Sequence, residues 1–233
     1  MINLKKIRES ISQLEGTDEG ELRNVLVNSK LLSLTQPVFF DELFFIIEDI
    51  KRSNIQGCVI EAGVWSGATA IYIKALMNFF EINRNLWLLD GFGQELDFSF
   101  FKHEKDIIAI KKFISWEDVK TPSKEDVINN FKIFDLWDEK IEIIQGDIFN
   151  TYNLCFEDSI ALLRVDLDFY ESTYFILEKF YERVSIGGYV VIDDYGVNEF
   201  NCKEAVDKFR SENNILTELK RVGDFVAYWR KEN

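Results

Sequence analysis

Histidine and cysteine are scarce in this sequence, and each shortage excludes a class of protein. His103 is the only histidine among 233 residues. A serine hydrolase triad or a histidine-rich metal site would have to be built around this residue alone, which argues strongly against both. The three cysteines, Cys58, Cys155 and Cys202, lie far apart and form no CxxC pair. Their odd number and spacing argue against a disulfide framework and a zinc ribbon.

Long apolar runs and excess positive charge are also absent. No run approaches the ~20 residues that a membrane-spanning helix needs, so we expect no membrane span. The first ten residues, MINLKKIRES, lack the apolar core of a signal peptide, so we expect a cytoplasmic protein. The 27 Lys and Arg residues are outnumbered by 41 Asp and Glu residues, and they are scattered. Nucleic acid is therefore not an expected partner.

The residues that are present suit one globular domain. The sequence is 47% hydrophobic and 15% aromatic, and no Gly/Ser-rich linker or internal repeat divides it. A chain of this length can bury most of its apolar surface without disulfides or a structural metal. We therefore predict a single domain over 1–233.

Hydrophobic periodicity predicts a helical arm followed by alternating strands and helices. In the arm, residues 1–56, the segments ELRNVLVNSKLL and FFDELFFIIEDIKR have helical spacing. Its aromatic residues suit either a homodimer contact or cover for a sheet edge. After the arm, apolar runs alternate with helical segments, and strands are predicted at 58–63, 86–90, 141–147, 160–166, 189–194, 215–222 and 224–230.

The strand pattern predicts an α/β fold with a doubly wound, mostly parallel, seven-stranded sheet. Continuous apolar runs are typical of parallel strands covered on both faces. The last two strands leave no room for a crossover helix, so they are predicted to pair as an antiparallel hairpin. Residues 91–140 form a long insertion of the kind that often serves as a lid, and Ser123 with Asp126 predicts a capping box within it.

A glycine-containing turn, EAGVWSGAT over 61–69, follows the first strand and leads into a helix. Glycines there allow a ligand to approach the backbone, and the helix start offers amides to an anion such as a cofactor carboxylate. Because the spacing is G-x-x-x-G, the G-x-G-x-x-G dinucleotide fingerprint is absent. An ordinary tight turn is the alternative.

Two single aspartates follow the next strands. Asp90 ends the second strand, where an acidic residue can bind ribose hydroxyls. Asp147 follows the third strand, where folds of this kind often contact adenine. A turn residue is the alternative for each, and the stronger one for Asp147.

Four carboxylates follow the fourth and fifth strands: Asp166 and Asp168 after one, Asp193 and Asp194 after the other. Neighbouring strands would bring them together at the carboxyl edge of the sheet, where open α/β folds bind ligands. Because like charges repel, a hard divalent cation with oxygen ligands, Mg²⁺ first, is expected among them. For any one residue alone, a strand-end or N-cap role is the simpler account.

The segments EAGVWSGATA, LLRVDLDFYESTYFILEKFYERVSIGGYVVIDDYG and CKEAVDKF resemble the macrocin O-methyltransferases, which methylate sugar hydroxyls in antibiotic biosynthesis. The resemblance runs from about residue 24 to the terminal hairpin. It implies a class I S-adenosylmethionine-dependent methyltransferase fold, Mg²⁺ dependence and a sugar-containing acceptor. It also implies roles for individual residues. Mg²⁺ would be held by Asp166, Asp193 and Asp194, and Asp168 would be the general base. S-adenosylmethionine would be contacted by Glu61, Gly63 and Asp90. Val64, Gly67, Thr69 and Asp147 are also expected to bind the cofactor.

The insertion is rich in aromatic residues that suit a stacking platform for a sugar ring: Phe92, Phe98, Phe100, Phe101, His103, Phe113 and Trp116. Most of them equally suit a small satellite core that holds the insertion down. His103 is a candidate acceptor contact or a structural residue.

We therefore interpret the sequence as a Mg²⁺-dependent O-methyltransferase that uses S-adenosylmethionine on a sugar hydroxyl, with Asp168 taking the proton. The first alternative is an NAD(P)-dependent oxidoreductase, which the missing fingerprint and the terminal hairpin disfavour. The second is a non-catalytic cofactor-binding scaffold.

Overall fold

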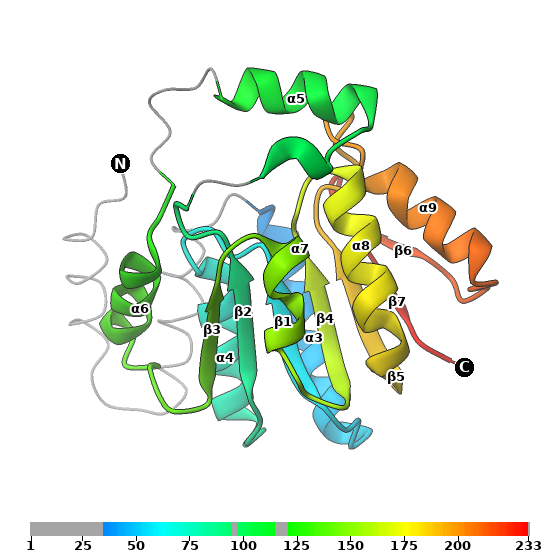
Figure 1. Ribbon diagram of the computed structural model, residues 1–233. Helices are drawn as coiled ribbons and strands as arrows, with labels where there is room; N and C mark the ends of the chain where they lie inside the picture. The colour runs from blue at the N-terminus through cyan, green and yellow to red at the C-terminus, as the bar shows by residue number, and fades with distance from the viewer. Residues whose placement is uncertain (1–34, 95–96, 115–120, 233) are drawn as a thin grey trace.

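The computed structural model describes residues 35–94, 97–114 and 121–232 (Figure 1). The helix predicted over 21–32 lies outside this part of the chain. The arm's second predicted helix is present as α3, Pro37–Arg52, which has proline at its start and Lys51 and Arg52 in its last turn. Both features are favourable for a helix.

Seven strands form one sheet, in the order β3-β2-β1-β4-β5-β7-β6. The first five strands pair in parallel, whereas β7 pairs antiparallel with both β5 and β6. This arrangement confirms the predicted mostly parallel sheet and its terminal hairpin. The strands are β1 Cys58–Ala62, β2 Leu86–Asp90, β3 Ile141–Gln145, β4 Ile160–Val165, β5 Val184–Ile192, β6 Lys220–Val222 and β7 Val226–Arg230.

Strand β5 begins five residues earlier than the sequence pattern indicates. Its first part, Val184–Gly188, contains a serine and two glycines, so it lacks the apolar run that marks a buried strand. Gly187 has a φ of +83° and donates its amide to the carbonyl of Lys231. A long-range contact with the end of the chain therefore supports this part of the strand, and local patterning does not reveal it.

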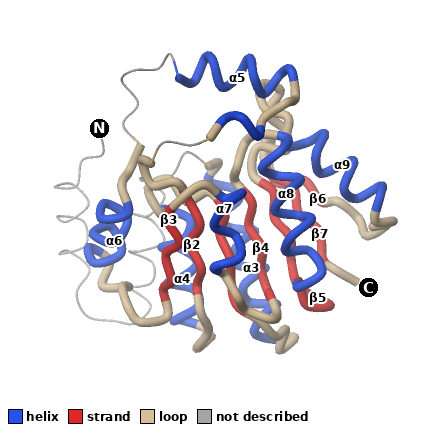
Figure 2. The backbone as a smooth tube through the Cα atoms, in the orientation of Figure 1, coloured by secondary structure: helices blue, strands red, loops and turns tan. Residues whose placement is uncertain are grey.

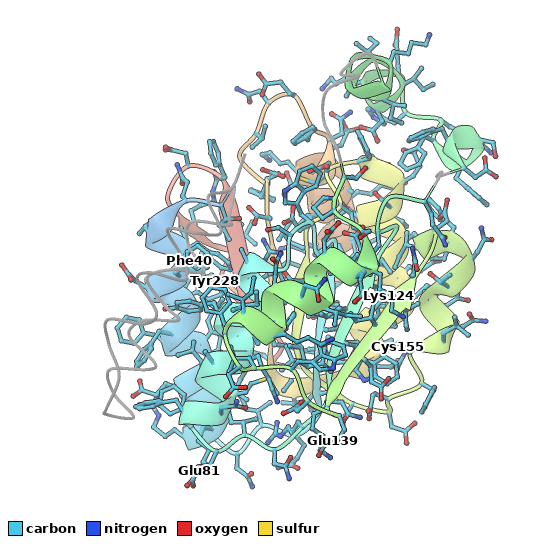
Figure 3. All side chains as sticks on the ribbon, turned by 90° about the vertical axis from the view of Figure 1, so that its left-hand side faces the viewer. Phe40, Glu81, Lys124, Glu139, Cys155 and Tyr228 are labelled. Carbon is cyan, nitrogen blue, oxygen red and sulfur yellow. The ribbon has the colours of Figure 1, made fainter. Side chains whose placement is uncertain are left out.

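Helices cover both faces of the sheet (Figure 2). Besides α3 they are α4 Ala68–Phe79, α5 Glu104–Ile114, α6 Lys124–Ile133, α7 Ile148–Thr151, α8 Tyr170–Phe180 and α9 Cys202–Glu212. One core cluster lies between the sheet and α3, α4 and α6, and it includes Phe40 and Tyr228, which are distant in sequence but neighbours in the fold (Figure 3). The second cluster lies on the other face, under α7, α8 and α9. None of the helices in the described part of the chain is both long and apolar enough to cross a bilayer.

The insertion at 91–140 divides into two parts. Helix α5 lies beyond the carboxyl edge of the strands, at the top of Figure 1. Helix α6 begins at the predicted capping box, in which Ser123 and Asp126 exchange hydrogen bonds. Its residues Val127 and Phe131 are fully buried against the first core cluster. The second part of the insertion therefore belongs to the wall of the core, and α5 is the part that lies over the sheet edge.

Candidate active site

The turn after β1 depends on two glycines with left-handed backbone conformation. Gly63 has a φ of +84° and Gly67 a φ of +82°. A Cβ atom on Gly63 would lie 1.7 Å from the carbonyl oxygen of Asp166, and one on Gly67 would lie 3.0 Å from Val127 Cγ1. The first glycine is therefore required by the close approach of β4, and the second allows α6 to cover the start of α4.

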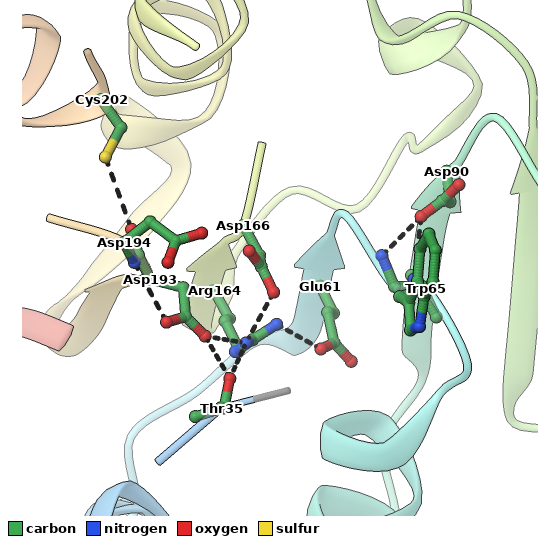
Figure 4. A network of polar contacts seen from close by, with 10 residues as sticks. Thr35, Glu61, Trp65, Asp90, Arg164, Asp166, Asp193, Asp194 and Cys202 are labelled. Carbon is green, nitrogen blue, oxygen red and sulfur yellow. Dashed lines mark hydrogen bonds and ion pairs between the residues drawn. The ribbon is translucent and has the colours of Figure 1, made fainter. Parts of the chain in front are cut away.

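Asp90 holds this turn in place. Its Oδ2 accepts the amides of Val64 at 2.6 Å and Trp65 at 3.0 Å, and its Oδ1 accepts the amide of Phe92 at 2.8 Å (Figure 4). A carboxylate has about four acceptor positions. Three are used by the backbone here, which leaves room for one hydroxyl donor.

Glu61 and Arg164 form a buried ion pair beneath the turn. Glu61 Oε1 lies 2.5 Å from Arg164 Nη1, and both side chains are almost wholly buried. Glu61 Oε2 is also buried and has no hydrogen-bond partner among the described residues. Burial, opposed by Arg164, raises the pKa of Glu61 to about 7.

Arg164 also binds two of the strand-end carboxylates. Its Nη2 lies 2.8 Å from Asp166 Oδ2 and forms a second ion pair with Asp193 (Figure 4). Thr35 Oγ1 donates to Asp193 Oδ2 at 2.6 Å. One guanidinium therefore links β1, β4 and β5 directly below the carboxyl edge of the sheet. Sequence reasoning did not single out Arg164, although a charged residue inside the apolar run IALLRV was a usable signal.

Asp166, Asp168 and Asp194 form a carboxylate cluster at the ends of β4 and β5. One oxygen of each lies within 4.8 Å of the others, and all three residues are half-buried. Asp168 and Asp194 have φ values of +61° and +53°, so the chain turns sharply after each strand. Loss of water contact and the neighbouring carboxylates raise the pKa of Asp168 well above its ordinary value.

The structure places Asp193 apart from this cluster. Its side chain is directed toward Arg164 and Thr35, and its Oδ1 accepts the amide of Asp194 at 3.0 Å. The resemblance assigns Asp193 to the cation, but here both of its oxygens are engaged elsewhere. The group that the structure brings together contains Asp168 in its place.

The two remaining predicted cofactor residues have structural contacts. Thr69 lies in the first turn of α4 and is buried. Asp147 is the N-cap of α7, where its Oδ1 accepts the amide of Phe149 at 3.0 Å, and its Oδ2 accepts the amide of Asp97 at 3.0 Å. This is the turn role that the sequence offered as the stronger alternative for Asp147.

The aromatic residues of the insertion pack mainly on one another and on α7. Phe92 lies in the first core cluster. Phe100 stacks on Phe149 at 4.6 Å between ring centroids, and Phe101 contacts Phe149 and Phe169. Phe98 lies against Phe101. These contacts fit the satellite-core interpretation, while the side chain of Phe113 and all of Trp116 lie outside the described part of the chain.

A groove of about 440 Å³ opens along the segment that follows β5. It lies between the segment 195–201, which directly follows Asp194, and residues of α5 and α9. Most of its lining is polar or charged, including Lys105, Asn198, Asn201 and Glu204. Such a lining suits a ligand with many hydroxyl groups.

Comparison with known proteins gives consistent matches over nearly the whole chain. Residues 33–231 match the macrocin-O-methyltransferase family. The demethyldecarbamoylnovobiocin O-methyltransferase of Streptomyces niveus is 33% identical over 187 residues, which cover 79% of this chain and 70% of that protein. The 8-demethyl-8-(2,3-dimethoxy-alpha-L-rhamnosyl)-tetracenomycin-C 4'-O-methyltransferase of Streptomyces olivaceus is 26% identical over 219 residues, covering 94% of this chain and 79% of that protein. The solved structure of the O-methyltransferase NovP matches with a TM-score of 0.80 at 26% identity, covering 99% of this chain and 98% of that chain.

Proposed function

The chain belongs to the macrocin O-methyltransferase family and is an O-methyltransferase, and we propose that it methylates a sugar hydroxyl with S-adenosylmethionine in a Mg²⁺-dependent reaction. The observation that carries the proposal is the position of the carboxylate cluster next to the glycine turn. The amide of Asp166 donates to the carbonyl of Ala62 at 2.7 Å, so the two features meet where β1 and β4 end. Open α/β folds bind ligands at this point, where the strand order reverses.

The buried carboxylate of Glu61 suits the methionine part of S-adenosylmethionine. Its Oε2 is a buried acceptor without a partner among the described residues, and leaving such a group unsatisfied is costly. The ammonium group of the cofactor would supply the missing donor. Asp90, with one acceptor position open, would take a ribose hydroxyl. When bound, the cofactor supplies a methyl group activated by a sulfonium leaving group.

The carboxylate cluster suits a hard divalent cation. Three half-buried carboxylates within 4.8 Å of one another repel unless a positive charge or a proton lies among them. Oxygen-only donors match the preference of Mg²⁺. We propose Asp166 and Asp194 as its ligands, and the resemblance adds Asp193, which would have to give up a contact with Arg164, Thr35 or Asp194. When bound, the cation lowers the pKa of the acceptor hydroxyl and orients it.

Asp168 is proposed as the general base. One of its oxygens lies within 4.8 Å of oxygens of Asp166 and Asp194, so a hydroxyl oriented by a cation on those residues would be within its reach. The sugar would lie in the groove beside Asp194, and the remainder of the acceptor would extend between α5 and α9. The name of the Streptomyces olivaceus relative specifies a rhamnosyl acceptor, which supports a sugar hydroxyl here.

Calorimetry with S-adenosylhomocysteine and NADH tests the cofactor assignment. We expect S-adenosylhomocysteine to bind and NADH not to bind. Glu61→Gln removes a charge-assisted hydrogen bond and should weaken S-adenosylhomocysteine by roughly 10–100-fold. Glu157→Gln is the matched control, since Glu157 accepts from Asn85 and Trp87 at the opposite edge of the sheet. Tight NADH binding without S-adenosylhomocysteine binding would instead support the oxidoreductase alternative, which family membership disfavours.

A cytoplasmic location and a homodimer remain predictions for this protein. The exposed aromatic residues Phe45 and Phe79, on α3 and α4, mark the surface where we expect a dimer contact. Light scattering of the purified protein measures the oligomeric state, and a monomer at all concentrations contradicts the homodimer.

A further inference from the structure

Two acidic residues, Asp106 of α5 and Glu171 of α8, join these helices at their starts. The amide of Tyr170, the first residue of α8, donates to Asp106 Oδ2 at 2.6 Å. In return, the amides of Lys102 and His103, directly before α5, both donate to Glu171 Oε1 at 2.6 Å. Amides at a helix start have no acceptor within their own helix. Each carboxylate therefore satisfies the start of the other helix.

Asp106 also connects to α9. Its Oδ1 accepts the side-chain amide of Asn201 at 2.9 Å, and Asn201 directly precedes α9. The same side-chain amide lies 3.0 Å from His103 Nδ1. Asp106 is fully buried, although neighbouring positions on α5 such as Ile107 and Ile108 are exposed. A charged side chain buried in this way is unusual unless it makes specific contacts.

The contacts of Asp106 lie on both sides of the loop that carries Asp168. Tyr170 lies two residues after Asp168, and its amide is bound by Asp106. The carbonyl of Asp168 accepts the amide of Cys202 at 3.1 Å, and Cys202 follows the Asn201 that Asp106 also binds. The loop 167–170 therefore has its position fixed from α5 at one end and from the start of α9 at the other.

We propose that Asp106 is a positioning residue which, paired with Glu171, locks α5 of the insertion onto the loop 167–170 and thereby holds Asp168 in place for proton transfer. The role of Asp168 rests on the proposed function, whereas the lock itself does not. Misplacing a catalytic group by about 1 Å can cost roughly 10²-fold in rate.

The carboxyl group of Glu171 lies beside that of Asp106, and each affects the pKa of the other. Burial and this contact raise the pKa of Asp106 to about 6. Among the described residues, the titratable groups around the pair include His103 and Glu204 of α9, which lies 3.5 Å from His103 Nε2. Tyr170 stacks on His103, and Lys208 Nζ of α9 lies 5.8 Å from the centre of the Tyr170 ring. Above that pH Asp106 loses its proton and two carboxylates repel, so the lock weakens as pH rises.

Hydrogen exchange measured by mass spectrometry tests the lock without any acceptor. After correction for intrinsic exchange, the protection of residues 98–114 in the wild type should fall roughly fourfold between about pH 5.5 and about pH 8. Asp106→Asn keeps an acceptor and a permanent donor toward Glu171, so its protection should not change with pH. Asp106→Ala should show low protection at both values, and Glu104→Ala, on the exposed side of α5, is the control that should behave as wild type.

Kinetics then test the positioning role. Asp106→Ala should lower kcat roughly 10–100-fold while the calorimetric affinity for S-adenosylhomocysteine stays unchanged, and Asp106→Asn should restore most of the rate. If residues 98–114 of Asp106→Ala are as protected from hydrogen exchange as in the wild type, Asp106 does not lock α5 onto the loop. A wild-type kcat, or a lower kcat with unchanged protection, overturns the positioning role. If no form transfers methyl groups, the proposed function fails, and the exchange measurement still decides on the lock.

Discussion

Removing the charge of Arg164 should destabilise the fold in a way that depends on pH. Methionine at this position, near the carboxyl end of β4, fills much of the same volume, so Arg164→Met removes the guanidinium with little change in packing. The change leaves Glu61 and Asp193, whose side chains are 1% and 6% exposed, without their cation. Breaking a buried ion pair costs about 3–5 kcal/mol, because the remaining charge is left uncompensated.

The size of the loss should increase as pH rises. In the wild type the pKa of Glu61 is raised to about 7, so its contribution to stability is greatest at low pH and is lost as pH rises through that value. Without Arg164 the pKa of Glu61 rises further, and the protonated form persists to higher pH in the folded state only. The difference in the free energy of unfolding between Arg164→Met and the wild type should therefore increase between about pH 5.5 and about pH 8.

Thermal unfolding followed by circular dichroism at both pH values measures this effect. A loss of about 3–5 kcal/mol corresponds to a decrease in Tm of roughly 6–20 °C for a domain of this size. Arg183→Met is the matched control, since Arg183 binds the backbone carbonyls of Cys155 and Glu157 and, in the part of the chain that the structure describes, forms no ion pair with a carboxylate. The decrease in Tm caused by Arg183→Met should be the same at both pH values. A Tm of Arg164→Met within about 2 °C of wild type, or a gap that does not widen with pH, would refute the reasoning.

Two further sets of variants test the site and the turn. Asp166→Asn should raise the Mg²⁺ concentration needed for activity by roughly 10–100-fold. Asp168→Asn should instead keep Mg²⁺ binding and lower kcat by roughly 10²–10⁴-fold. Loss of Mg²⁺ binding in Asp168→Asn would show that Asp168 is a metal ligand. Asp193→Asn should change the Mg²⁺ requirement less than Asp166→Asn, and an equal effect would place Asp193 among the ligands. Gly63→Ala should destabilise by roughly 3 kcal/mol or more in a denaturant titration, because its Cβ would meet the Asp166 carbonyl at 1.7 Å. Gly93 has a similar φ of +75°, but a Cβ atom there would lie no closer than 3.6 Å to any atom of the described residues. Gly93→Ala should therefore cost clearly less, and equal losses would contradict this explanation.

The alternation of strands and helices, and the edge of the sheet that carries the site, could be predicted from the sequence. Apolar runs ending in acidic residues mark β2, β4 and β5, and parallel strands place those ends on one edge. The capping box at Ser123 and the terminal hairpin depend on local residue types, so they too were predictable. The early start of β5 could not be predicted, because the Gly187 amide binds the carbonyl of Lys231, near the far end of the chain.

The directions of the acidic side chains could not be predicted. Spacing places Asp193 and Asp194 side by side, but the choice between Arg164 and the carboxylate cluster is made by contacts between strands that are distant in sequence. Asp90 is similar, because its three amide donors come from the turns after two different strands. The resemblance named these residues as functional, and the structure adds which groups hold each of them.

We propose that this protein moves a methyl group from S-adenosylmethionine to a sugar hydroxyl when Mg²⁺ is present. The most direct measurement uses S-adenosylmethionine carrying a deuterated methyl group, a panel of glycosides, and tandem mass spectrometry of the products. Enzyme dialysed against EDTA should show no transfer, and added Mg²⁺ should restore a label that stays with the sugar fragment. A label found only outside the sugar, or transfer that continues undiminished in excess EDTA, would contradict the account.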